Sequence, residues 1–365
     1  MARYDTERGN KKLRFLDRYI GIPLVFLLGL FKLKKNSITL RTVRNAAFLE
    51  TAAIGDTVLL SASIADFKQA YPDARLTLFT GSSNYETASL LSGINNVIKL
   101  PLKNPVRAIQ VIKEAGLFDV WFDFGAWPRL NAILSSFSNA TLKIGFKTPK
   151  QYRHYIYDIV IPHSSEVHEI KNYRNLMLAV GIRGNNLPCI ALDAPVDARR
   201  VVIHMFPGGS RSYLKEWPAE CWIELINFLT EAGFTIYITG ASVDRQRALE
   251  LQRQVLNKDS VIIAAGNQTL REVVKLLKSA IVVISVDTGI MHLASALRCN
   301  LISLHGPTFA NRWGALNVNS ISLQGALDCS PCLNLGFESD CNQNSCMKRI
   351  SVKDVVKAFK KFVSI

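Results

Sequence analysis

Short runs of consecutive apolar residues alternate along the chain with longer segments whose apolar residues recur at helical spacing. Such runs are typical of strands that are buried on both faces of a parallel sheet, and helices join strands of this kind. The predicted strands are residues 44–53, 76–80, 97–100, 118–122, 142–146, 155–160, 201–206, 235–239, 261–264, 281–286 and 301–304. The predicted helices are residues 58–71, 85–91, 106–114, 168–180, 219–232, 270–277 and 352–362. The pattern therefore predicts an α/β fold with parallel, doubly wound sheets and right-handed crossovers.

A stretch rich in Gly, Asn and Pro interrupts this alternation and is typical of an interdomain linker. It separates two Rossmann-like halves, and a chain of 365 residues is long enough for two such domains. The predicted parts are an N-terminal extension at 1–40, a first domain at 41–185, the linker at 186–200, a second domain at 201–348 and a C-terminal helix at 349–365. We expect this last helix to be able to pack back on the first domain.

The second domain contains the most informative stretch, residues 280–307. A β-branched strand ends there at the polar elbow Asp287-Thr288-Gly289, and His292 follows in the first turn of the next helix. Ligands of open α/β sheets bind at such strand ends, where helix N-termini present unpaired N–H groups. The elbow also fits an ordinary N-cap or half of an aspartic protease site, and His292 also fits a structural role. A protease needs two carboxylates, and the chain has no second triplet of this kind.

Polar residues follow two further strand ends. Asp56 comes after the first strand and just before a helix, where it fits either a general base or a helix cap. In the second domain, the glycine-rich turn 207–211 is followed by Lys215. Several glycine-rich turns at strand ends of one domain suggest a cradle of backbone N–H groups for a diphosphate. The turn is neither a Walker A loop nor a G-x-G-x-x-G motif.

The N-terminal extension contains an apolar segment, residues 19–31, that ends in three lysines, Lys32, Lys34 and Lys35. A spanning helix needs about 20 apolar residues, and this segment is shorter and contains Pro23. The lysine-rich end offers no small-residue cleavage site for a secretory signal. Two interpretations stay open, an interfacial membrane helix and a helix that packs on the protein's own surface.

The chain has a formal net charge of +15, which points to a polyanionic partner. Nucleic acid, an anionic membrane surface and a phosphorylated glycolipid all satisfy this charge. The sequence has no paired zinc-finger spacing, no aromatic RNA-binding signature and no basic recognition helix. Nucleic acid is therefore the least favoured of the three partners.

The seven cysteines are unevenly distributed. Three are scattered and are typical of small core residues in a reduced, cytoplasmic protein. The other four have the spacing C-x2-C-x8-C-x4-C, which fits a tetrahedral thiolate site for zinc or iron, and they are Cys329, Cys332, Cys341 and Cys346. Thiols without a metal and disulfides remain the alternatives.

Several of these motifs together resemble glycosyltransferase family 9, the heptosyltransferases. They are AIGDTVL at 53–59, YPDARL at 71–76, PGGSRSYLKEWPAE at 207–220, VDTGIMHLASAL at 286–297 and HGPT at 305–308. The pieces occur in the family's order across almost the whole chain, except for the first 40 residues. The resemblance implies the GT-B architecture, in which two Rossmann-like doubly wound domains face a cleft.

The resemblance also implies roles for individual residues. Asp56 matches the family's general base, and Lys215 matches the lysine that binds the donor phosphates. The neighbouring phosphate positions are Ser210 and Arg211, of which Arg211 departs from the small hydroxyl residue common there. The remaining donor-binding positions are Asp244 at the ribose and the Asp-Thr-Gly-x-x-His residues Asp287, Thr288, Gly289 and His292.

The implied activity is an inverting, metal-independent transfer of heptose from a nucleoside diphosphate donor, ADP-heptose, to a lipopolysaccharide core acceptor. No catalytic cofactor is expected, and the expected partners are the nucleotide sugar, an anionic glycolipid and the inner membrane surface, with no nucleic acid. The expected location is cytoplasmic and peripheral to that membrane. Two alternatives stay open: the same fold with another donor sugar or a protein acceptor, and a non-catalytic nucleotide-sugar or lipid-binding protein.

Overall fold

The structure is a computed structural model that describes residues 11–31, 42–209, 211–333 and 341–364. The described chain divides after Leu187 into two compact units. We call them the N-terminal unit, up to residue 187, and the C-terminal unit, from residue 188.

The N-terminal unit is built on a six-stranded parallel sheet with the order β3-β2-β1-β4-β5-β6. Its strands are β1 (Asn45–Glu50), β2 (Arg75–Thr80), β3 (Asn96–Lys99), β4 (Phe118–Asp123), β5 (Ala140–Lys147) and β6 (Ile159–Pro162). Its helices are α1 (Lys11–Tyr19), α2 (Gly21–Leu30), α3 (Ile54–Ala70), α4 (Tyr85–Ala88), α5 (Pro105–Glu114), α6 (Arg129–Ser136), the 3₁₀ turn η2 (Arg153–Tyr155) and α7 (Glu169–Leu178).

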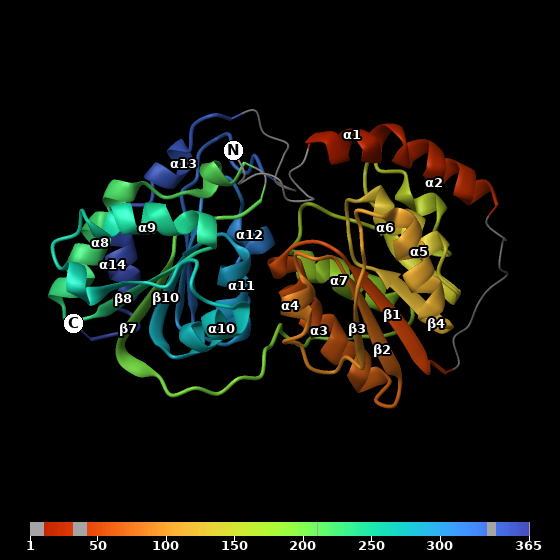
Figure 1. Cartoon of the computed structure of the whole chain (residues 1–365), viewed down its shortest axis with the longest axis horizontal. Coiled ribbons are helices and arrows are strands. Elements are labelled where there is room, and N and C mark those ends of the chain that lie inside the picture. Colours follow the sequence, from red (N-terminus) through yellow and green to blue (C-terminus); the bar gives the residue numbers. More distant parts are fainter. Residues whose placement is uncertain (1–10, 32–41, 210, 334–340, 365) are drawn as a thin grey trace. The chain divides into compact units, whose positions relative to one another are not determined.

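Helices cover both faces of this sheet, with α5 and α6 on one face and α3 and α7 on the other (Figure 1). Alternate residues of β1 serve the two layers, because successive side chains of a strand point to opposite faces. Leu49 packs in the cluster that contains Trp121 and the α5 side chains, whereas the ring of Phe48 lies 5.5 Å from that of Phe67 in α3. A strand buried in this way needs a nearly continuous apolar sequence, as predicted.

The C-terminal unit repeats the design with the strand order β12-β11-β10-β7-β8-β9, again parallel throughout. Its strands are β7 (Asp197–His204), β8 (Thr235–Thr239), β9 (Val261–Ile263), β10 (Ala280–Val286), β11 (Leu301–His305) and β12 (Ser320–Gln324). Its helices are η3 (Ser212–Lys215), α8 (Ala219–Glu231), η4 (Ser242–Asp244), α9 (Arg245–Gln252), η5 (Lys258–Ser260), α10 (Leu270–Lys278), α11 (Gly289–Ala296), α12 (Ala310–Trp313), α13 (Ser345–Lys348) and α14 (Val352–Phe359). The two sheets confirm the predicted α/β fold class.

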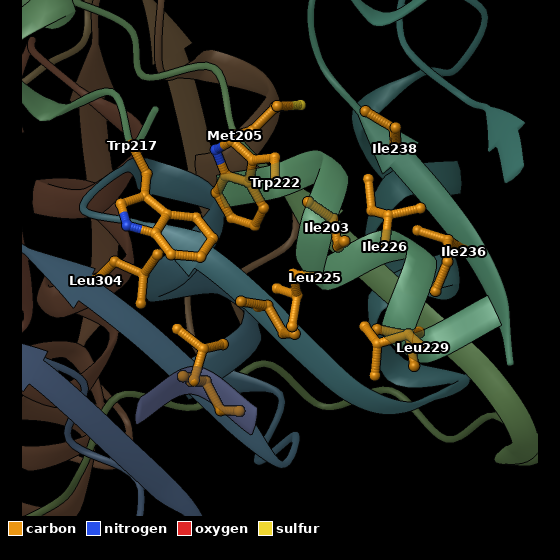
Figure 2. Packing of buried hydrophobic residues seen from close by; sticks show 14 of the residues in the cluster. Ile203, Met205, Trp217, Trp222, Leu225, Ile226, Leu229, Ile236, Ile238 and Leu304 are labelled. Carbon is orange, nitrogen blue, oxygen red and sulfur yellow. The ribbon is translucent and has the colours of Figure 1, made fainter. Parts of the chain in front are cut away.

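The core of the C-terminal unit lies between α8 and its sheet (Figure 2). The rings of Trp217 and Trp222 meet edge to face with centroids 4.8 Å apart, a favourable aromatic geometry. The indole N–H of Trp217 donates to the carbonyl of Ile350, 2.9 Å away. This bond joins the segment before α8 to the segment before α14.

The C-terminal helix is part of the C-terminal unit. There, α14 packs against α8, β11 and β12. Phe359 is fully buried there, with its ring 5.2 Å from that of Phe234. The amphipathic pattern correctly marked a buried face, but it carried no information about which neighbour covers that face.

Candidate active site

The candidate residues fall into two groups, one in each unit. The N-terminal unit carries Asp56, and the C-terminal unit carries the other described candidates. Ser210 lies outside the described residues.

Asp287 lies at the carboxyl end of β10, directly before α11. Thr288 is the N-cap of α11, and its hydroxyl accepts hydrogen bonds from the backbone N–H groups of Ile290 and Met291 at 3.2 and 3.4 Å. The cap pairs two of the N–H groups that a helix start leaves unsatisfied. The elbow is thus a helix cap, as one interpretation held, and it fixes the direction in which Asp287 leaves the sheet.

A buried hydrogen-bonded cluster surrounds the Asp287 carboxylate, which is 5% exposed. The hydroxyl of Thr308 donates to Asp287 Oδ2 at 2.7 Å, and Lys215 Nζ lies 3.4 Å from the same oxygen. Lys215 also donates to the backbone carbonyl of Asp287 at 3.3 Å. The structure therefore brings Lys215 and Asp287, 72 residues apart, into one charged site.

The Asp287 carboxylate is strongly held in its ionised form. Burial by itself would raise its pKa, because it disfavours the charge. The Lys215 cation has the largest opposing effect, followed by His305 and His292. With the Thr308 hydrogen bond, these groups lower the pKa of Asp287 from 3.8 to about 2. An acid this strong is a poor proton acceptor near neutral pH, so Asp287 suits the binding of hydroxyl groups better than the role of base.

The turn between β7 and η3 carries the phosphate-binding candidates. Its backbone enters the left-handed region at Gly209, with φ +92°, and again at Arg211, with φ +50°. An arginine is strained at such an angle, whereas glycine is not. Arg211 donates to the carbonyl of Cys341 at 3.4 Å. The last residue of η3 is Lys215, whose side chain is 18% exposed and thus remains accessible to a ligand.

Asp244 ends the 3₁₀ turn that follows β8 and is buried. One of its carboxylate oxygens, Oδ2, accepts a hydrogen bond of 3.0 Å from the backbone N–H of Ala241. Because β8 and β10 flank β7 in the sheet, Asp244, Lys215 and Asp287 all follow the carboxyl ends of neighbouring strands.

Three further residues lie at the carboxyl ends of the strands of this sheet and had no predicted role: His204, His305 and Thr308. His204 Nδ1 lies 3.0 Å from the Thr239 hydroxyl, and burial lowers the pKa of His204 to about 4. Burial also lowers the pKa of His305, although Asp287 opposes this effect. The HGPT motif was the available signal for His305 and Thr308, since it follows the strand next to β10.

In the N-terminal unit, Asp56 lies within the first turn of α3, not before the helix as predicted. It is 9% exposed, and the helix N-terminus favours its negative charge. Ala53, at the N-cap, has φ +45°, an angle rare for a residue other than glycine. Strain of this kind at a turn is a frequent mark of functional sites.

A second carboxylate, Glu50, lies at the end of β1 and was missed because it stands inside the apolar run. Its Oε1 accepts from the backbone N–H of Ala52 at 3.0 Å, and Oε2 lies 3.4 Å from the Tyr173 hydroxyl. Glu50 is 2% exposed. These contacts hold the strand-to-helix turn that leads to Asp56.

A buried ion pair lies at the carboxyl end of the neighbouring strand, β4. Asp123 Oδ2 accepts from Arg153 Nη2 and from the Tyr157 hydroxyl, both at 2.5 Å. Arg153 also donates to the carbonyl of Gly125. Burial raises the pKa of Tyr157 well above its usual value, so the phenol stays protonated and donates. This network attaches the segment after β5 to the carboxyl edge of the sheet.

The four clustered cysteines, Cys329, Cys332, Cys341 and Cys346, line one pocket of about 450 Å³. Burial raises the pKa of Cys346, and the neighbouring Cys332 and Cys329 act in the same direction. Four thiols on one pocket have the donor chemistry of a zinc or iron site. Within the described ranges, however, no three His, Cys, Asp or Glu side chains are gathered closely enough to hold a metal ion.

The two sheets, with helices on both faces of each, have the GT-B architecture. The solved structure of ADP-heptose lipopolysaccharide heptosyltransferase II from Escherichia coli has this fold, with a TM-score of 0.71 and 16% identity. The match covers 87% of this chain and 98% of that one. The iron-containing dodecameric glycosyltransferase TibC of enterotoxigenic E. coli matches with a TM-score of 0.58 and 16% identity, over 90% of this chain and 78% of TibC.

The model of glycosyltransferase family 9 (heptosyltransferase) matches residues 130–341, which is more than half of the chain. The chain belongs to this family. Lipooligosaccharide heptosyltransferase 2 of Campylobacter jejuni is 23% identical over 84% of this chain and 94% of its own length. Lipopolysaccharide heptosyltransferase 1 of Pseudomonas aeruginosa is 32% identical, but that match spans only 35% of this chain and 36% of the relative.

Proposed function

We propose that the protein transfers heptose from ADP-heptose to a lipopolysaccharide core acceptor. The observation that carries the proposal is the buried cluster of Asp287, Lys215 and Thr308 at the N-terminus of α11, in a chain of the heptosyltransferase family. Its groups match the needs of a nucleotide-sugar donor, because a cation lies beside an ionised hydroxyl-binding carboxylate. The identities of the sugar, the nucleotide and the acceptor, namely heptose, ADP and lipopolysaccharide, are taken from the names of the relatives.

On the donor side, the reaction develops negative charge on the departing diphosphate and positive charge on the sugar ring. Lys215 and Arg211, with the backbone N–H groups of Gly208 and Gly209, stabilise the diphosphate without a divalent metal. Asp287 accepts hydroxyl groups of the sugar, and Asp244 accepts those of the ribose. Further donor-binding positions are Thr288, Gly289 and His292.

On the acceptor side, Asp56 is the general base. An acceptor hydroxyl oxygen attacks the anomeric carbon as its proton passes to the Asp56 carboxylate, and the bond between that carbon and the diphosphate oxygen breaks. ADP leaves with the electron pair. A single displacement of this kind inverts the anomeric configuration and requires no cofactor.

The acceptor is an anionic glycolipid, which agrees with the net charge of +15. We place the protein at the cytoplasmic side of the inner membrane, attached peripherally. Of the helices in the described ranges, none combines the length and apolar character that a membrane crossing requires.

We propose that Cys329, Cys332, Cys341 and Cys346 come closer together to bind a structural zinc or iron ion, because among the described residues they line one pocket but are not gathered closely enough to hold a metal. The support is the four thiols on one pocket and the iron content of TibC. The ion has no part in the reaction. Elemental analysis of protein purified without chelators tests this; less than about 0.1 equivalent of either metal would refute it.

The donor is tested by thermal shift with ADP, UDP and GDP, since a ligand that binds the folded state raises its melting temperature. We expect ADP to stabilise the protein most, and stabilisation by UDP or GDP alone would overturn the ADP-heptose assignment. Asp56→Asn should keep the ADP shift but lose transfer, measured by mass spectrometry of the acceptor product. Transfer retained in Asp56→Asn would remove Asp56 from the role of base. If the wild type is stabilised by ADP but transfers no sugar, the protein is a non-catalytic nucleotide-sugar binder.

A further inference from the structure

Helix α2 is apolar on all sides, but it buries only one of them. Gly21, Val25 and Gly29 follow one another at intervals of four residues and form the inner side. Val25 is fully buried beside Ile156, and a Cβ built on Gly29 would lie 2.9 Å from the side chain of Tyr155. The glycines thus allow α2 to lie close against its neighbours, which include α6 (Figure 1).

The opposite side of α2, together with α1, exposes many large apolar side chains. Nine of the 21 large hydrophobic side chains that are exposed in the described chain lie between residues 15 and 31. Scattered exposed hydrophobics are normal, whereas a concentration of this kind marks an interaction surface. We call it the apolar platform; its residues are Phe15, Leu16, Tyr19, Ile20, Leu24, Phe26, Leu27, Leu30 and Phe31, with Tyr152 and Tyr155 beside Phe26.

A buried arginine fixes the platform to the unit. The Asp17 carboxylate in α1 forms an ion pair with Arg129 in α6, with 2.5 Å between Asp17 Oδ2 and Arg129 Nη1. The same guanidinium donates to the carbonyls of Gln151 and Lys150 at 2.9 and 3.0 Å. Arg129 is 4% exposed. One side chain therefore joins α1, α6 and the turn that carries Tyr152, so the platform is part of the folded unit.

Length and charge together identify what the platform fits. With 10 residues, α2 is about 15 Å long, half of the ~30 Å thickness of a bilayer core. Residues 11–31 carry four Lys or Arg and one Asp, and that Asp is paired with Arg129. Protein interfaces are depleted in lysine, whereas interfacial membrane helices combine Phe and Leu with surrounding Lys and Arg. Tyrosine rings such as those of Tyr19, Tyr152 and Tyr155 favour the headgroup level of a bilayer.

We propose that the apolar platform docks onto an anionic lipid bilayer surface without crossing it. The leucine and phenylalanine side chains enter the boundary between headgroups and acyl chains, and the basic residues contact lipid phosphates. If the proposed function holds, which this last step rests on, docking keeps the unit that carries Asp56 next to a lipid-borne acceptor.

Flotation with vesicles tests the proposal on the full chain. One set of vesicles is phosphatidylcholine alone, and the other also contains phosphatidylglycerol. We expect the wild type to float with the anionic vesicles, more weakly at high salt, and Leu24→Glu with Leu27→Glu to reduce the bound fraction at least about tenfold. Val106→Glu with Leu117→Glu is the matched control, because these two residues are exposed on the same unit outside the platform.

Two results would overturn the proposal. The first is binding of the Leu24/Leu27 variant equal to that of the control. The second is a wild type that stays off the vesicles and forms a dimer that this variant dissociates, measured by light scattering, because the platform would then join two copies of the chain. ADP stabilisation and transfer to a delipidated acceptor saccharide are measured on the same variants. Both should be unchanged, so loss of docking and failure of the proposed function are told apart.

Discussion

The hydroxyl of Thr308 donates a hydrogen bond of 2.7 Å to Oδ2 of Asp287, the same oxygen that faces Lys215. Asp287 directly follows β10 and Thr308 follows β11, so the bond joins the segments at the ends of two adjacent strands. It orients the carboxylate and leaves its other oxygen, Oδ1, as the one to receive a sugar hydroxyl. In the proposed function, Thr308 is therefore a positioning residue, which acts on the donor through Asp287.

Replacement of Thr308 with Val keeps the shape of the side chain but removes the hydrogen bond. We expect the pKa of Asp287 to rise and kcat/KM for the donor to fall about tenfold, because a hydrogen bond to a charged group contributes about 1.5–3 kcal/mol. Steady-state kinetics with varied donor provide the measurement. Thr308→Ser retains the hydroxyl and should remain near wild type; an equal loss in Ser and Val would assign the effect to packing.

Lys215→Met removes the cation that faces both Asp287 and the proposed diphosphate. We expect kcat/KM to fall by about 10²–10³, the range for loss of one group that stabilises developing charge. ADP stabilisation should weaken in parallel, measured by thermal shift. The control is Lys353→Met, an exposed lysine on α14. A Lys215→Met enzyme with unchanged ADP binding would show that the lysine supports Asp287 alone.

The stability of the C-terminal unit should depend on pH through His204. Burial lowers the pKa of His204 from 6.5 to about 4, so between these values the unfolded chain binds a proton that the folded chain does not. The free energy of unfolding should therefore decrease as pH falls from 6.5 to 4, by up to roughly 3 kcal/mol. Urea unfolding of the wild type and of His204→Asn isolates this contribution. Parallel pH profiles for the two proteins would exclude it.

Arg153→Met should destabilise the N-terminal unit by about 3–5 kcal/mol, because it leaves the Asp123 carboxylate buried without a cation. Chemical denaturation followed by tryptophan fluorescence measures the loss, since Trp121 is fully buried in the same strand. The double variant Asp123→Asn with Arg153→Met removes both charges and should recover part of the stability. No recovery would mean that the packing of Arg153, not its charge, stabilises the unit.

The strands were largely predictable because burial on both faces demands apolar runs that a sequence displays directly. β8 occupies the predicted residues 235–239. In contrast, β12 was missed, because it lies at the edge of its sheet and its Ser320 and Ser322 interrupt the apolar pattern. The start of α3 was predicted too late, since the helix is buried nearly all round and shows no amphipathic beginning.

The candidate site was predictable where a motif stands at a strand end, as for Asp287 and Lys215. Glu50 was not assigned a role, because it stands inside an apolar run and its partner is distant in sequence. Tyr173, which contacts Glu50, lies 123 residues further along the chain. Contacts of this kind arise only when the strands are placed side by side, so no local pattern reveals them.

Because α14 packs within the C-terminal unit, a single cut between residues 187 and 188 leaves each unit with all of its own described strands and helices. Chimeras between members of the family should therefore need only one crossover at this position. A hybrid with the N-terminal unit of one relative and residues 188–365 of this chain should combine the acceptor preference of the first with the donor preference of the second.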